Sequence, residues 1–150
     1  MNSDRACRSY RSFLEGLSPA GIHILDDIAV PHVKLRDPFN DAYGVEEVKK
    51  VFLALFEDVD APRFTVTHSA CSGNVCFFRW HFTCRPRLHG KGHPWLADGV
   101  TEIHFTEDGR IIELVDYWDA GRYVYERIPV LRLFIRWLRK RLRTVGAAPD

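Results

Sequence analysis

Apolar residues recur at helical spacing in three segments before residue 60, and each segment predicts a helix. The first begins near Ser3 and has its apolar positions at Cys7, Tyr10, Phe13, Leu14 and Leu17. The second has Ser18 as its N-cap and Pro19 in its first turn, and Pro31 ends it. The third covers residues 45–59, where an apolar stripe lies opposite charged residues. A short strand at 33–37 and a loop at 38–44 separate the last two helices.

After Pro62 the apolar period changes from 3.6 to 2, which predicts four antiparallel strands. Turns at 72–74 and 107–109 each join two of these strands into a hairpin, and residues 88–98 form a loop. In the longest strand, residues 75–85, alternation puts one set of side chains on the apolar face: Cys76, Phe78, Trp80, Phe82 and Cys84. A helix is expected over 122–143. This order predicts an α+β fold with helices packed on a curved antiparallel sheet.

The composition is that of one packed domain with an unusual distribution of charge. The chain has 150 residues, of which 46% are hydrophobic, and a net charge of +1. Residues 122–143 contain eight Lys or Arg and one Glu, a net charge of +7, which leaves −6 for the rest. We therefore expect a domain over residues 1–121, a basic amphipathic helix over 122–143 and a disordered tail over 144–150.

The sequence has no apolar stretch of transmembrane length and no secretion signal at its start. These features predict a cytoplasmic protein, in which Cys7, Cys71, Cys76 and Cys84 are reduced thiols. The four cysteines include no Cys-x-x-Cys pair, so a zinc ribbon or a redox pair is not expected. Neither a metal nor an organic cofactor is predicted.

Three passages together resemble one protein superfamily. Asp37-Pro38-Phe39 ends a strand, Gly44 opens a helix that contains Phe52 and Phe56, and residues 105–112 form a hairpin that leads to Tyr117-Trp118. In order and spacing they resemble the nuclear-transport-factor-2-like superfamily, in its SnoaL-like and ketosteroid-isomerase-like branch, over residues 5–121. The resemblance implies a cone-shaped barrel with an apolar pocket. Members include isomerases, cyclases, dehydratases, hydrolases and binding domains, so the fold alone selects no function.

The resemblance makes Asp37 the first catalytic candidate. In ketosteroid isomerases the matching Asp of the Asp-Pro pair is the general base, and a carboxylate facing an apolar pocket would have a raised pKa. The structural alternative is that Asp37 only forms a turn with Pro38.

Asp116 is the second catalytic candidate, from its position in the last strand. It alternates in phase with Leu114 and Trp118, so it faces the apolar side, where an unpaired carboxylate is costly. Together with Asp37 it would form an acid/base pair. The alternatives are an ion pair with a buried Arg or a strand end already in water.

Two departures from the family pattern argue against steroid isomerase activity. The position of the isomerases' Tyr oxyanion donor falls on Phe13, which cannot donate, and that of their protonated Asp falls on Thr101, a weak donor. Tyr10 lies one turn from Phe13 and could substitute. We expect six residues to line the ligand pocket: Tyr10, Phe13, Thr101, Trp80, Trp95 and Trp118.

The remaining candidates concern partners. His89, His93 and Asp98 lie in a Gly- and Pro-containing loop, where a histidine pair predicts a flap rather than a metal site. By the resemblance, the outer sheet face pairs two subunits, which makes Arg79, His81 and His104 candidates for a homodimer interface.

The basic helix over 122–143 has three possible partners. It could dock on the acidic body or a partner subunit, lie on an anionic membrane surface such as the inner membrane, or touch nucleic acid, which is the least expected of the three. The sequence therefore predicts a small-molecule protein with proton-transfer chemistry. The alternative is a non-catalytic lipophile-binding or dimer-assembly module.

Overall fold

A computed structural model describes residues 3–86 and 94–143. The chain divides into two compact units, Met1–Trp118 and Asp119–Asp150. The expected tail over 144–150 and the histidines of the 88–98 loop, His89 and His93, lie outside the described residues.

Of the three helices predicted before residue 60, the first and the third are confirmed and the second is much shorter than predicted. Helix α1 covers Ser3–Glu15 and α3 covers Val45–Asp58, whereas α2 is only Ile24–Ile28. Residues 19–23 form turns, and the backbone N–H of Gly21 donates to the Ser18 hydroxyl over 3.1 Å. Ser18 therefore closes a turn and does not cap a helix, which corrects the predicted start of the second helix.

The described strands of the first unit form one six-stranded sheet. Its strands are β1 (Ala29–Arg36), β2 (Asp41–Tyr43), β3 (Val59–Ser72), β4 (Val75–Pro86), β5 (Trp95–Phe105) and β6 (Ile111–Trp118), in the spatial order β2-β1-β6-β5-β4-β3. The four predicted antiparallel strands are β3 to β6. The sheet also includes β1, which runs parallel to β6, and β2, which replaces part of the predicted 38–44 loop.

Both prolines expected to lie outside strands are inside them. Pro31 lies in β1 where the register to β6 shifts between Ala29 and Lys34, and Pro62 lies in β3 where the register to β4 shifts between Asp60 and Arg63. Proline cannot donate a ladder hydrogen bond, so an irregularity is where a strand can accept it.

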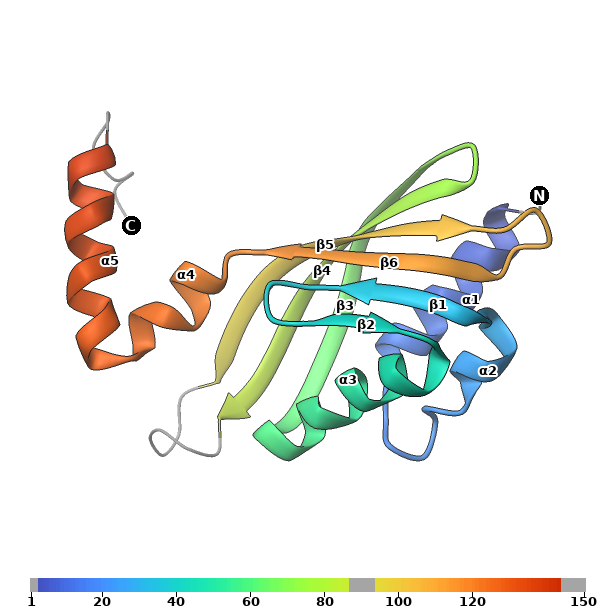
Figure 1. Cartoon of the computed structure of the whole chain (residues 1–150), viewed down its shortest axis with the longest axis horizontal. Helices are drawn as coiled ribbons and strands as arrows, with labels where there is room; N and C mark the ends of the chain where they lie inside the picture. The colour runs from blue at the N-terminus through green and yellow to red at the C-terminus, as the bar shows by residue number, and fades with distance from the viewer. Residues whose placement is uncertain (1–2, 87–93, 144–150) are drawn as a thin grey trace. The chain divides into compact units, whose positions relative to one another are not determined.

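The sheet is curved, and α1, α2 and α3 pack on its inner face (Figure 1). The predicted alternation along β4 is confirmed, since Cys76, Phe78, Trp80 and Cys84 are buried while Phe77 is 41% exposed. The hydrophobic core thus lies between the inner face and the helices, and inward-pointing polar residues of the sheet lie in apolar surroundings.

Two of the four cysteines form a disulfide in the structure, whereas the sequence predicted four reduced thiols. Cys71 and Cys76 are opposite each other at the end of the β3–β4 hairpin and are joined by a disulfide. The adjacent strands hold the two residues face to face, which their separation of five in the sequence did not indicate.

The second unit contains three short helices where one continuous helix was predicted. Helix α4 covers Ala120–Tyr123, a 3-10 turn covers Tyr125–Arg127, and α5 covers Pro129–Leu142. Pro129 is the first residue of α5, because its missing N–H and fixed φ suit a helix start and not a helix interior. Arg139 of α5 forms ion pairs with Glu126 and, at 3.4 Å, with Asp119.

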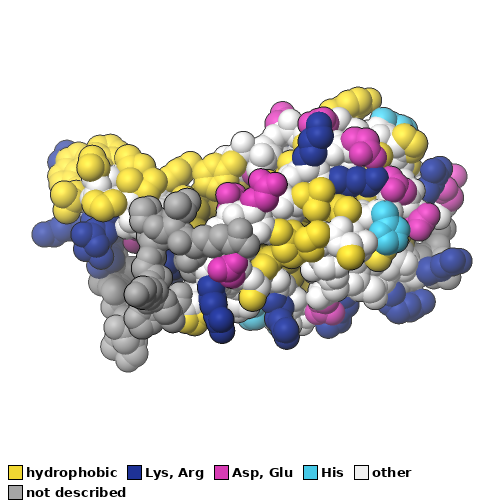
Figure 2. Space-filling view, turned by 90° about the horizontal axis from the view of Figure 1, so that it is seen from below, with side chains coloured by type: hydrophobic (Ala, Val, Ile, Leu, Met, Phe, Trp, Pro, Cys, Tyr) yellow, Lys and Arg dark blue, Asp and Glu magenta, His cyan; other side chains and the backbone are white. Residues whose placement is uncertain are grey.

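Helix α5 exposes much of its apolar surface. Its exposed residues include Val130 (79%), Leu133 (68%), Phe134 and Trp137. Hydrophobic side chains gather on one side of this unit and Lys and Arg on another (Figure 2). Within residues 3–86 and 94–143, no helix combines the length and hydropathy needed to span a membrane.

Candidate functional site

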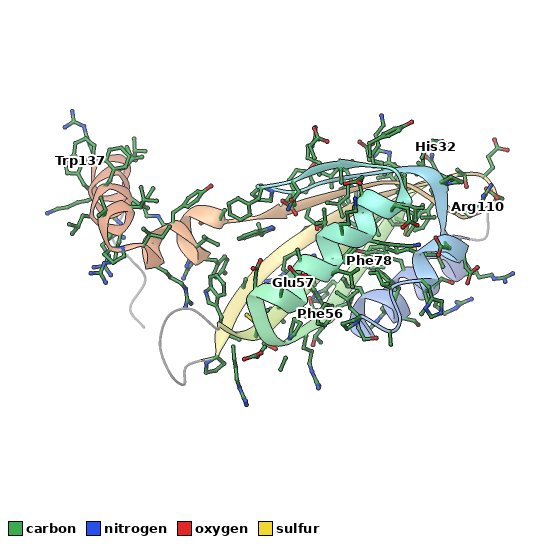
Figure 3. All side chains as sticks on the ribbon, turned by 60° about the horizontal axis from the view of Figure 1, so that its bottom comes forward. His32, Phe56, Glu57, Phe78, Arg110 and Trp137 are labelled. Atoms are coloured by element: carbon green, nitrogen blue, oxygen red, sulfur yellow. A yellow bond between two sulfur atoms is a disulfide. The ribbon has the colours of Figure 1, made fainter. Side chains whose placement is uncertain are left out.

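A row of side chains crosses the inner face of the sheet and ends at two carboxyl groups, those of Asp116 and Asp37. Phe78 of β4 pairs with Thr101 of β5, which pairs with Asp116 of β6. Asp37 follows Arg36, the residue of β1 that pairs with Val115, so the parallel register puts Asp37 next in the row. The row begins in the interior at Phe78, between the sheet and the helices (Figure 3), and ends with the two candidate carboxylates.

Asp116 is held by a chain of two hydrogen bonds. The indole N–H of Trp80 donates to the Thr101 hydroxyl over 2.9 Å, and that hydroxyl donates to Oδ1 of Asp116 over 2.5 Å. Thr101 is 1% exposed and its hydroxyl is used in both directions. The indole orients the hydroxyl, and the hydroxyl fixes the carboxyl group.

Gly99 lets Trp80 take this position. A Cβ at Gly99 would lie 2.3 Å from two carbon atoms of the Trp80 ring, so any side chain there would displace the indole. Gly99 pairs with both Trp80 and Trp118. The hydrophobic pattern does not point to this residue, although a glycine inside a strand is a known sign of close approach by another group.

The pKa of Asp116 is raised far above the ordinary value of an Asp carboxyl group. Its side chain is half-buried, and the protein packed around the carboxyl group raises its pKa to about 7. The Thr101 hydrogen bond lowers this pKa, and the negative charge of Asp37 raises it further. A carboxyl group of this kind exchanges a proton near neutral pH.

Tyr10 of α1 completes the polar group from the opposite side. It is 2% exposed and its ring packs edge-on against Phe78 at 5.1 Å between centroids. Its pKa is raised above the ordinary value, first by burial and then by the charge of Asp116, while a hydrogen bond with Thr101 opposes the rise. Tyr10 therefore remains a neutral phenol beside the Asp116 carboxyl group.

The Asp37 carboxylate forms a turn with the residues that follow it, which is the alternative to a catalytic role considered from the sequence. Its Oδ1 accepts hydrogen bonds from the backbone N–H groups of Phe39 (2.7 Å) and Asn40 (2.8 Å), and the Asn40 side-chain amide also donates to the carboxylate. This turn places Phe39 edge-on against Trp118, with ring centroids 5.5 Å apart. Asp37 thus acts on Asp116 through its charge, and its turn places an aromatic residue that our sequence analysis did not consider.

The other predicted pocket residues are dispersed around this group. Phe13 is buried against Phe52 at 5.4 Å, Trp118 is half-buried and Trp95 begins β5 opposite Cys84. Two surface grooves of the described chain are lined by other residues, one by residues 15–17 and 62–65 and one within the second unit. The predicted apolar pocket at Asp116 therefore stays a prediction.

The residues predicted for the outer sheet face lie there. Arg79 and His81 are exposed, and His104 is half-buried. His81 pairs with Asp98 of β5, so Asp98 belongs to this face and not to a loop. His104 lies 2.7 Å from Glu102, to which the Tyr117 hydroxyl donates over 3.0 Å.

One group among the described residues has the ligand types and spacing of a metal site. It consists of the sulfur atoms of Cys7, Cys71 and Cys76, which lie within 4.8 Å of one another, although Cys71 and Cys76 are joined by the disulfide and would have to be reduced before they could bind an ion. The group lies apart from the Asp116 row, at the end of the β3–β4 hairpin, and no residue of that row belongs to it.

Comparison with protein families gives one match, to the SnoaL-like domain over residues 10–114. The chain belongs to the SnoaL-like family. The match includes Tyr10, Asp37 and Thr101 and ends two residues before Asp116. A comparison with curated protein sequences finds no match.

Solved structures of similar fold carry several functional names. A protein from Catenulispora acidiphila with a ketosteroid isomerase-like fold, in complex with trimethylamine, has a TM-score of 0.68 at 13% identity and covers 82% of this chain and 92% of its own. A proposed SnoaL-like polyketide cyclase from Jannaschia has 0.67 at 15%, covering 78% and 87%. A proposed isomerase of the SnoaL-like family from Agrobacterium tumefaciens has 0.63 at 18%, covering 78% and 97%. At these identities the likeness shows the fold.

Proposed function

We propose that this protein catalyses proton transfer on a small hydrophobic substrate that contains a carbonyl group, with Asp116 as the group that takes and returns the proton. The observation that carries the proposal is the placement of the Asp116 carboxyl group, which the Trp80–Thr101 chain holds on the inner face beside Tyr10. The names of the similar structures, an isomerase and a polyketide cyclase, belong to the same reaction class.

Each neighbour has a role in this proposal. Proton abstraction beside a carbonyl group leaves negative charge on the carbonyl oxygen, which needs a hydrogen-bond donor. Tyr10 is a neutral donor, and Thr101 orients the carboxyl group. Burial keeps the proton affinity of Asp116 high, and the negative charge of Asp37 raises it further. Trp118 follows Asp116 by two residues on β6 and packs edge-on against Phe39, and these two rings would provide apolar contact for the substrate.

Hydrogen–deuterium exchange tests this function without knowledge of the natural substrate. The protein in D2O would be incubated with a panel of cyclic ketones and 1,3-diketones, and exchange at the carbon beside the carbonyl group would be followed by NMR. We expect Asp116→Asn to lower the catalysed rate by about 100-fold or more, the usual contribution of a general base. Asp98→Asn, on the outer face, is the matched control and should leave the rate unchanged. Equal rates for Asp116→Asn and the native protein would refute the proposal.

A second proposed function concerns the C-terminal unit, which we propose binds an anionic membrane surface at the cytoplasmic side of the inner membrane. Helix α5 exposes Leu133, Phe134 and Trp137, and Arg141 lies 5.8 Å from the centre of the Trp137 ring. Basic amphipathic helices with an exposed tryptophan bind the headgroup region of anionic bilayers. Self-association of two copies through residues 122–143 would bring two segments of net charge +7 together, and their electrostatic repulsion opposes such a dimer.

Vesicle flotation tests the second function. Full-length protein should float with vesicles of phosphatidylcholine mixed with phosphatidylglycerol, should not float with phosphatidylcholine alone, and should dissociate in high salt. Leu133→Gln should reduce flotation severalfold. Leu96→Gln is the control, because Leu96 on β5 is similarly exposed at 61%, compared with 68% for Leu133. Equal flotation of the two variants, or equal binding to both vesicle types, would refute membrane binding through α5.

We also propose that the outer sheet face forms a homodimer. Phe77 and Tyr117 are 41% and 51% exposed on this face, beside Arg79 and His104. Light scattering of the native protein should give twice the chain mass, and Phe77→Lys should give the monomer. A native monomer would exclude the interface.

A further inference from the structure

Three cysteine sulfurs meet where α1 crosses the end of the β3–β4 hairpin. Cys7 comes from α1, Cys71 from β3 and Cys76 from β4, and 64 residues separate Cys7 from Cys71. The Cys7 sulfur lies 3.2 Å from that of Cys71 and 3.1 Å from that of Cys76. The fourth cysteine, Cys84, does not belong to this group. Neither spacing nor alternation in the sequence indicates the group, because only the fold brings α1 to the hairpin.

The two distances decide between two chemistries. Thiol–disulfide exchange requires a thiolate to approach one sulfur along the axis of the bond that breaks. Cys7 is almost equally distant from both sulfurs of the Cys71–Cys76 disulfide, so it lies beside the bond and not at its end. Once the disulfide is reduced, the same three sulfurs can instead surround a central ion as three separate ligands.

We propose that Cys7, Cys71 and Cys76, in their reduced form, bind one Zn²⁺ ion. Zinc–thiolate bonds are about 2.3 Å long, which puts three sulfurs around the ion about 4 Å apart. Each Cys7 distance would need to lengthen by less than about 1 Å to reach this value. The Cys71 and Cys76 side chains would separate once their disulfide is reduced.

The surroundings suit a soft ion with one open coordination position. Cys76 is buried, Cys7 is half-buried and Cys71 is exposed, so the site is closed on the core side and open to water on the other. Thiolates select zinc over the hard ions magnesium and calcium. Water fills the fourth position of the tetrahedron.

The disulfide and the zinc site are two states of the same three residues. A dithiol reductant gives two electrons and two protons to the Cys71–Cys76 disulfide and becomes a cyclic disulfide itself. Zinc then replaces the protons of the three thiols, which are released to water. Reoxidation of Cys71 and Cys76 removes two of the three ligands and releases the ion. The inference does not depend on the proposed catalytic function.

Metal titration of the reduced full-length protein tests the site. The protein is reduced with dithiothreitol, desalted without oxygen, and titrated with Zn²⁺ against a chromophoric chelator. We expect one ion per chain, and at least about 100-fold weaker binding in Cys7→Ser, since a ligand is lost. Cys84→Ser is the matched control and should bind as the native protein does. With Co²⁺ as the probe, the sulfur-to-metal charge-transfer band should fall by about a third in Cys7→Ser.

Two results would overturn the inference. One is equal Zn²⁺ affinity in the native protein and in Cys7→Ser. The other is no Zn²⁺ binding by reduced protein that keeps its native circular dichroism spectrum. If Cys7→Ser does not fold, Cys71→Ser replaces it, because Cys71 is exposed and its loss leaves the core intact. Peptide mapping that finds Cys7 in a disulfide, together with no ion binding, would assign the group to thiol exchange instead.

Discussion

The inner and outer faces of β5 and β6 each carry a carboxyl group, Asp116 and Glu102, whose pKa values are shifted in opposite directions. The two residues occupy neighbouring positions in the register of the two strands. On the inner face, burial raises the pKa of Asp116 to about 7. On the outer face, hydrogen bonds from His104 and then from Tyr117 lower the pKa of Glu102 below its ordinary value. Both carboxyl groups accept hydrogen bonds, so hydrogen bonding alone does not explain the difference. Desolvation on the inner face outweighs one hydrogen bond, so Asp116 changes its protonation near neutral pH whereas the pKa of Glu102 lies below its ordinary value.

The largest expected effect concerns the stability of the inner face at different pH values. Because the pKa of Asp116 is raised in the folded state, the carboxyl group stabilises the fold at low pH and loses that contribution as the pH rises through about 7. Asp116→Asn should therefore be more stable than the native protein at pH 8 by at most about 4 kcal/mol, and equal to it at low pH. Urea unfolding at several pH values measures this. A native protein that gains stability between pH 5 and 8 relative to Asp116→Asn would contradict it.

The next effect tests the close packing that orients the inner group. Gly99→Ala should destabilise the fold by about 3 kcal/mol, because the new methyl group overlaps the Trp80 ring. The backbone of the hairpin glycine Gly73 has a φ of 60° and no atom near its Cβ position, so Gly73→Ala reports backbone strain without a clash and should cost about 1 kcal/mol. Thermal unfolding compares the two variants. Equal losses would mean that Trp80 is not held against Gly99.

A smaller effect separates the Thr101 hydroxyl from its volume. Thr101→Val keeps the shape but removes the acceptor for Trp80 and the donor to Asp116, at a cost of about 2 kcal/mol. The pKa of Asp116 should rise, because the hydrogen bond that lowers it is lost. Chemical denaturation and a pH titration followed by NMR check both effects. An unchanged pKa would exclude the hydrogen bond.

The smallest effect is expected on the outer face. The lowered pKa of Glu102 means that its charged form stabilises the fold above its ordinary pKa, and that this contribution is lost as the pH falls through the lowered value. Glu102→Gln should cost less than about 1 kcal/mol at pH 7, because the group is partly in water. A loss as large as that of Gly99→Ala would show that the outer cluster is structurally essential.

Periodicity in the sequence predicted the sheet better than it predicted the elements around it. Alternation along β4 put Phe78 and Trp80 on the core side, as the structure does, because one buried face fixes the register. It could not show that β1 pairs in parallel with β6 and brings Asp37 beside Asp116. That pairing joins residues about 80 positions apart and leaves no local signal.

Some local signals in the sequence do indicate where the helices begin and end, in ways that the apolar pattern alone does not. Pro129 lies within the predicted helix over 122–143, and proline at such a position favours a helix start. Pro31 was expected to end a helix, but the chain is already a strand from Ala29. The contacts that Tyr10 and Cys7 of α1 make with the sheet, including Thr101, depend on how α1 packs across it. That packing is decided by side-chain volumes throughout the core and has no local signal in the sequence.

The central claim is that the inner face makes Asp116 a proton-exchanging group at neutral pH. Its most direct test is the carboxyl-carbon NMR titration of Asp116 in the native protein and in Asp37→Asn. We predict a midpoint of about 7 in the native protein, and a lower midpoint in Asp37→Asn because the neighbouring negative charge is removed. A native midpoint near the ordinary value of 3.8, unchanged in Asp37→Asn, would contradict the account.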